Sequence, residues 1–165
     1  MKVFKVRSDT EIDDAAKLMR GLYKAVKSLN PDDLERIEDY YRGSWFFDSS
    51  PEIPTEYRPP QGDVLIAYLS DRPIGTVAVC RMDRDHCELK SMFVEEDFRG
   101  SGVAPALCKR VIGLAKEQGY RTVRLMTGDR QAPARRLYER LGFKMVTSWD
   151  ANPHEAHDYF ELGIA

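Results

Sequence analysis

Apolar side chains near the start of the chain recur every three or four residues, which is typical of an amphipathic helix. The apolar positions are Ile12, Ala15, Ala16, Met19, Leu22, Tyr23 and Val26. Thr10 and Asp13 form a capping arrangement before this run, and Asn30-Pro31 ends it. We expect a second helix to begin with Pro31 and to end near Gly43.

The pattern then changes to short apolar runs that predict strands. Residues 64–69 and 74–80 are joined by the turn sequence Ser70-Asp71-Arg72-Pro73, and residues 87–94 form a third run. Three such runs in succession predict an antiparallel meander.

Helical spacing returns at residues 104–115, and residues 122–126 resemble a further strand. A strand, a helix and a strand in this order predict a crossover with parallel strands. A short helix at 134–141 and two last strands, 143–148 and 159–164, follow. We therefore expect an α+β fold with a mixed central sheet, in one domain over residues 1–165.

Residues 44–63 are the irregular part of the pattern. They combine four prolines with aromatic side chains, a composition that breaks helices but offers apolar contact area. A loop of this length in a compact domain is often functional, and the alternative is that it only covers a sheet edge.

Composition narrows the class of protein. The 165 residues carry a net charge of −2, which argues against a nucleic-acid partner held by bulk electrostatics. The apolar runs are too short to span a membrane and the first residues do not resemble a signal peptide, so we expect a cytoplasmic protein. Three cysteines without close pairing indicate reduced core thiols, and the histidines lack metal-site spacing, so no metal is expected.

The turn Arg99-Gly100-Ser101-Gly102-Val103-Ala104 carries the most chemical information. Its glycines allow positive φ, and the free N–H groups of the following helix would attract a phosphate. The alternative is a purely structural glycine turn. A P-loop would need Gly-Lys-Ser/Thr, and a dinucleotide fingerprint would need a glycine where Pro105 stands.

Arg99-x-x-Gly102-x-Ala104 resembles the Q/R-x-x-G-x-G/A motif of the GNAT acyltransferase superfamily. The preceding residues 88–94 look like the fourth strand of that family, and Ala134-x-x-Leu137-Tyr138-x-x-x-Gly142-Phe143 is similar to its A-x-x-L-Y-x-x-x-G-F segment. The resemblance spans about residues 64–146 and implies a GNAT-like sheet, in which the meander strand and the strand after the crossover splay apart.

The resemblance also implies acetyl-CoA as the acyl donor. Its diphosphate would lie on the amides of residues 100–104, and its pantetheine arm would add to the exposed strand edge. Arg130 and Arg136 are further candidates for its 3′-phosphate. The implied cofactor-binding residues are Met92, Phe93, Val94, Arg99, Gly100, Ser101, Gly102, Val103, Ala104, Gln131, Ala134 and Arg135.

Two residues match catalytic positions of the family. Tyr138 resembles the general acid that protonates the departing thiolate, although a tyrosine on an apolar helix stripe is otherwise a core residue. Glu88 has the spacing of a catalytic glutamate that would accept the amine proton. The alternative for Glu88 is a surface ion pair with Lys90 on the same strand face.

We expect the acceptor pocket opposite the cofactor, formed by the second helix, the 44–63 loop, the ends of both splayed strands and the final hairpin. Its candidate residues are Tyr41, Trp45, Phe46, Tyr57, Thr127, Asp150 and His154. Acidic residues nearby (Asp48, Glu52, Glu56, Glu155, Asp158) weakly favour a cationic acceptor. The resemblance implies acetyl transfer, and we expect a small-molecule amine as the acceptor. Protein or peptide acetylation and a non-catalytic acyl-CoA sensor remain alternatives, and exposed aromatics also allow a homodimer contact.

Overall fold

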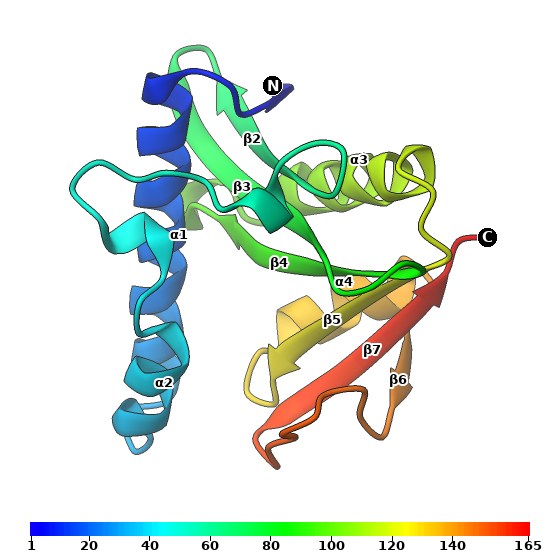
Figure 1. Ribbon diagram of the computed structural model, residues 1–165. Coiled ribbons are helices and arrows are strands. Elements are labelled where there is room, and N and C mark those ends of the chain that lie inside the picture. Colours follow the sequence, from blue (N-terminus) through cyan, green and yellow to red (C-terminus); the bar gives the residue numbers. More distant parts are fainter.

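The computed structural model describes residues 1–165 and contains a seven-stranded sheet in the order β1-β2-β3-β4-β5-β7-β6 (Figure 1). The strands are β1 (Lys2–Lys5), β2 (Asp63–Leu69), β3 (Arg72–Arg81), β4 (His86–Val94), β5 (Thr122–Gly128), β6 (Lys144–Val146) and β7 (His157–Gly163). The α-helices are α1 (Asp9–Leu29), α2 (Leu34–Tyr41), α3 (Val103–Glu117) and α4 (Ala132–Arg140), and the 3-10 helices are η1 (Trp45–Phe47), η2 (Thr55–Tyr57) and η3 (Glu96–Phe98).

The sheet is mixed, as the hydrophobic pattern predicts. β1 to β4 form an antiparallel meander, and β4 pairs with β5 in parallel after the crossover through α3. β7 lies between β5 and β6 and is antiparallel to both. The expected meander, crossover and final hairpin are confirmed.

Two local predictions at the N-terminal end were incomplete or wrong. β1 was not expected as a strand, because four residues with alternating lysines give a weak signal that suits an edge strand. The first helix is capped by Ser8 and not by Thr10. The side chain of Ser8 accepts a hydrogen bond from the Glu11 amide, and the Glu11 carboxylate accepts one from the Ser8 amide.

The core has two layers, one on each face of the sheet. Along β2, Val64 and Ile66 face the layer beneath α1, whereas Leu65 and Ala67 face the layer beneath α3. This alternation follows from the two-residue period of a strand buried on both faces. All three cysteines are free and buried, as expected. None of the helices combines the length and the apolar character that crossing a bilayer would need.

β4 and β5 separate after a short paired segment. Their register joins His86–Glu88 to Thr122–Arg124 and goes no further, so the later halves of both strands leave their facing backbone edges unpaired. Figure 1 shows the two strands diverging, with α1 and α2 on one side and β5, β7 and β6 on the other. The splay implied by the motif resemblance is present.

β4 also contains a bulge where it pairs with β3. Thr76 lies opposite Phe93 and Ala78 lies opposite Lys90, so Val77 faces an extra residue. Ser91, in the bulge, has a φ of 56°, which is unusual for a residue other than glycine.

Residues 44–63 contain the short helices η1 and η2. Their aromatic side chains pack against those of α1 and α2, with Tyr23 and Phe47 at a ring-centroid distance of 5.1 Å. Arg20 of α1 donates a hydrogen bond to the carbonyl of Phe46 at 2.7 Å. These contacts hold the segment over the α1 face of the sheet.

Candidate active site

A cavity of about 380 Å³ lies where β4 and β5 separate. Its walls come from α1, α2, the 44–63 segment, both splayed strands, α4 and β7. The predicted site residues that line it are Tyr41, Trp45, Phe46, Tyr57, Glu88, Met92, Thr127, Gln131 and Tyr138. The 44–63 segment therefore forms a wall of the cavity as well as covering the sheet.

Asp150 and His154 do not line this cavity, although both were expected at the acceptor. They lie in the connection between β6 and β7, where Asp150 accepts a hydrogen bond from the Asn152 amide at 3.0 Å. His154 is exposed, and its amide donates to the hydroxyl of Tyr159 at 3.1 Å. Both residues thus take part in the local hydrogen bonds of this loop.

Sequence reasoning missed several cavity residues. Two of them were interpreted differently, Asn30 as the end of a helix and Lys90 as an ion-pair partner. The other three belong to no motif of the sequence. Their spacing along the chain gives no sign that the fold brings them together. These residues are Asn30, Arg36, Tyr40, Lys90 and His157.

The glycine turn before α3 has the geometry of an anion site. Gly100 and Gly102 have φ values of 76° and 89°, which glycine adopts without a steric penalty. The turn from residue 100 to 102 is exposed, and the amides of residues 100–104 donate no hydrogen bond to any protein group. Free amides at the start of a fifteen-residue helix can bind a phosphate group.

Arg99 has a structural role in this turn. Its Nε donates to the carbonyl of Val94 at 3.0 Å, and its guanidinium stacks over the ring of Phe93 at 5.8 Å. The side chains of Phe93 and Val94 are buried. Phe93 and Val94 can therefore offer a bound ligand only their backbone, whereas Met92 is partly buried and lines the cavity.

The residues expected near the cofactor on and just before α4 differ in whether their side chains already have partners within the protein. Gln131 precedes the helix and accepts a hydrogen bond from Thr127 at 3.3 Å. Ala134 packs against the core below α3. The Arg135 guanidinium pairs with Asp158, and Arg130 pairs with Asp32, so both have carboxylate partners already. Arg136 is exposed and has no ion-pair partner.

Tyr138 projects from α4 into the cavity. Its side chain is 5% exposed, and its ring packs against Phe143 and Phe160. Its hydroxyl makes no hydrogen bond within the protein. Burial raises the pKa of the Tyr138 phenol well above its usual range, so the phenol is protonated at neutral pH. It can donate a proton to a group in the cavity.

Glu88 and Lys90 are neighbours on the cavity side of β4, but they do not form the surface ion pair considered from the sequence. Neither makes a hydrogen bond with another side chain. Burial raises the pKa of Glu88 against the opposing effect of Lys90. Burial alone would lower the pKa of Lys90, but Tyr40 and Glu88 outweigh it and the net shift is upward. The lysine is therefore cationic at neutral pH.

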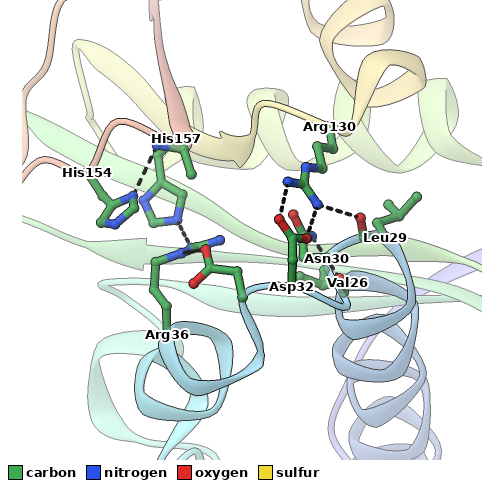
Figure 2. Close-up of polar contacts among 10 residues, drawn as sticks. Val26, Leu29, Asn30, Asp32, Arg36, Arg130, His154 and His157 are labelled. Carbon is green, nitrogen blue, oxygen red and sulfur yellow. Dashed lines mark hydrogen bonds and ion pairs between the residues drawn. The ribbon is translucent and has the colours of Figure 1, made fainter.

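Two arginine contacts connect the helical side of the molecule with the β5–β7 side (Figure 2). Arg36 of α2 lies 2.7 Å from Nε2 of His157 at the start of β7. Arg130 binds both carboxylate oxygens of Asp32, at 2.5 and 2.8 Å, and also the carbonyl of Leu29. Burial and Arg36 lower the pKa of His157, which favours the neutral ring as acceptor.

The fold contains no cluster of three or more His, Cys, Asp or Glu side chains suited to a metal ion. The polar groups of the cavity are thus amides, phenols and single charged side chains. Such groups can position two reactants, donate a proton and accept one.

Sequence comparison identifies relatives among acetyltransferases. A model of the acetyltransferase (GNAT) family matches residues 26–143. The N-acetylaspartate synthetase of Danio rerio is 39% identical over 97 residues, which cover 58% of this chain and 34% of that protein. An uncharacterised N-acetyltransferase of Methanocaldococcus jannaschii is 26% identical over 162 residues, covering 90% and 66%. The chain thus spans about a third of the first relative and about two thirds of the second.

Solved structures share the fold at low sequence identity. An acetyltransferase of the GNAT family from Staphylococcus aureus has a TM-score of 0.69 at 18% identity and covers 98% of each chain. A GNAT family acetyltransferase from Elizabethkingia anophelis with acetyl-CoA bound has a TM-score of 0.54 at 20% identity, covering 62% of this chain and 76% of that one.

Proposed function

Since this chain belongs to the GNAT acetyltransferase family, we propose that it transfers an acetyl group from acetyl-CoA to the primary amine of a small molecule. The observation that carries this proposal is the place of Tyr138, which faces a cavity at the point where β4 and β5 separate. A proton donor at that point can act on a thioester held between the strands.

The donor side of the site fits acetyl-CoA. The free amides of residues 100–104 suit its diphosphate, and charge-assisted hydrogen bonds of this kind contribute about 1.5–3 kcal/mol each. The unpaired edges of β4 and β5 suit the amides of a pantetheine arm. The bound donor supplies a thioester carbonyl, which a neutral amine can attack.

This chain's own residues would then serve two proton transfers. Glu88 would accept the proton of the incoming ammonium, directly or through water, because burial raises the pKa of its carboxyl toward that of a useful base. Tyr138 would donate its proton to the departing sulfur and regain one from solvent or the amine. Most of the acceleration would come from holding both reactants in place.

Cavity size favours a small acceptor over a protein segment. A volume of about 380 Å³ is within the usual range of small-molecule pockets. Walls from α2, the 44–63 segment and β7 surround it, so an extended peptide would have less room than in an open groove. Protein N-terminal acetylation is the second candidate, because one amino-terminal residue is no larger than a small amine.

The proposed function is tested by measuring CoA thiol release with a panel of amines and with peptides. The diphosphate contacts are tested separately with acetylpantetheine, which lacks that group. We expect turnover with at least one small amine, and a KM for acetylpantetheine at least a hundredfold above that for acetyl-CoA. Turnover of peptides alone would favour the second candidate. Equal KM values for the two donors would contradict the assigned role of the amide turn.

A further inference from the structure

Lys90 is the cation of the cavity that has no partner. It lies on β4 two residues after Glu88, so both side chains leave the strand on the same face. Both line the cavity and both are half-buried. The Lys90 ammonium lies over the Tyr40 ring, 6.0 Å from its centroid, and forms no ion pair.

The other charged groups around the cavity are already neutralised or exposed. Arg36 is bound by Asp33 and His157 (Figure 2). Arg42 pairs with Asp39 at 2.6 Å on the surface. Glu56 is exposed at the wall of the cavity, where solvent screens its charge. Lys90 and Glu88 are therefore the charged side chains of the wall that have no direct partner. Asp150, which does not line the cavity, is half-buried, and its charge acts on Glu88, Tyr40 and His157.

The acidic residues that favoured a cationic acceptor do not define this cavity. Asp48, Glu52 and Glu155 are exposed, and Asp158 pairs with Arg135. Of the acidic residues near the acceptor in sequence, only Glu56 reaches the wall. Most of the acidic residues that suggested a cationic acceptor therefore lie outside the cavity wall.

A half-buried ammonium without a hydrogen-bonded anion gains from a ligand that supplies one. Removing it from water costs free energy that a charge-assisted hydrogen bond offsets, and the partial burial strengthens that bond. Glu88, beside it, favours a positively charged or proton-donating group. A molecule with an amine and an anion a few bonds apart would satisfy both side chains at once.

We propose that the acyl acceptor is a free amino acid, whose carboxylate binds Lys90 while its amine lies against Glu88 and faces the thioester. This inference rests on the proposed function and specifies its substrate class. It also separates the two candidate acceptors, because the first residue of a protein carries an amide where a free amino acid carries a carboxylate.

The test compares matched acceptors and matched variants. Thiol release is measured with acetyl-CoA and the common L-amino acids, and again with the carboxamide of each amino acid that reacts. The variants are Lys90→Gln, which removes the charge, Lys90→Arg, which keeps it, and Lys17→Gln on the exposed face of α1 as a control. Acetyl-CoA binding to each variant is measured by calorimetry, which reports folding and the donor site independently of turnover.

We expect at least one amino acid to react with a kcat/KM at least tenfold above that of its carboxamide. Lys90→Gln should raise the KM for that amino acid by about tenfold to a hundredfold, change the carboxamide rate much less, and leave acetyl-CoA binding unchanged. Lys90→Arg should recover part of the loss.

Two outcomes would overturn the inference while leaving the proposed function intact. One is turnover of amines or carboxamides in preference to amino acids, and the other is an unchanged amino-acid KM in Lys90→Gln. A protein that binds acetyl-CoA but acetylates none of the amines, amino acids or peptides would instead overturn both proposals.

Discussion

The ring of Tyr138 packs edge-on against Phe143, with the ring centroids 5.8 Å apart. This contact fixes the direction of the phenol, so that its hydroxyl points away from the core and toward the cavity lined by β4 and β5. Phenylalanine at position 138 would keep the ring contact and lose only the proton donor. We therefore expect Tyr138→Phe to lower kcat by about tenfold or more, with a small change in the KM for acetyl-CoA.

Tyr120→Phe is the matched control for that measurement. Tyr120 is also buried, but its hydroxyl donates to the carbonyl of Gln61, away from the cavity. The control should lose stability on the order of 1 kcal/mol and keep its kcat. If both variants turned over like the wild type, Tyr138 would not be the acid.

Glu88 should control the acidic side of the pH–rate profile. Only its deprotonated form can accept a proton, and burial raises its pKa, so kcat/KM should rise with pH through a midpoint above the ordinary glutamate value of about 4.3. Glu88→Gln should remove that limb and lower kcat/KM at least tenfold. The part of the pH profile that reports deprotonation of the acceptor amine should be unchanged. Glu52→Gln, an exposed change outside the cavity, serves as control, and an intact acidic limb in Glu88→Gln would exclude Glu88 as the base.

Gly62 should be intolerant of any side chain. A Cβ there would clash with the carbonyl oxygens of Glu56 and Val79, which belong to the backbone and cannot move aside cheaply. We expect Gly62→Ala to lower the free energy of unfolding by about 1–3 kcal/mol in denaturant titrations. Gly113→Ala, in the middle of α3 with open space around it, should instead gain about 0.5–1 kcal/mol. Equal changes in the free energy of unfolding of the two variants would show that the backbone around Gly62 can accommodate a Cβ.

The three cysteines should be unreactive in the folded protein. Burial raises the pKa of Cys80, Cys87 and Cys108 to about 12 each, so almost no thiolate exists at pH 8. A chromogenic disulfide reagent should titrate no thiol in the native protein and three after unfolding. Rapid labelling of one thiol under native conditions would mean that its environment opens.

The elements that the sequence predicts well are those whose signals are local. The meander, the crossover helix and the glycine turn each show within a few neighbouring residues. The splay of β4 and β5 was also predicted, because the motifs that contain Arg99 and Tyr138 both resemble those of the same family. Bounds shift by a few residues, as at β3, which begins at Arg72 where a turn was expected.

The acceptor side was harder to predict because it depends on contacts between distant parts of the chain. Arg36 and His157 are 121 residues apart, and nothing in either neighbourhood points to the other. Asp150 and His154 were placed near the acceptor by sequence position alone, whereas the β6–β7 loop carries them outside the cavity wall. The acidic residues counted along the sequence did not indicate the charge of the cavity for the same reason. Most of them are exposed on the surface, and the charged residues of the cavity wall are largely different ones.

The extra residue at Ser91 shifts the alternation of side chains along β4 by one position. Before the bulge, Glu88 and Lys90 share the α1 side; a regular strand would put the next even-numbered side chains there too. Instead Phe93 takes that side, against Gly21, and Val94 joins the opposite layer. One strand face is therefore polar at one end and apolar at the other. Straightening the bulge with all residues kept would turn Phe93 out from beneath α1, whereas deleting Ser91 would leave Phe93 two positions after Lys90 and on the same face.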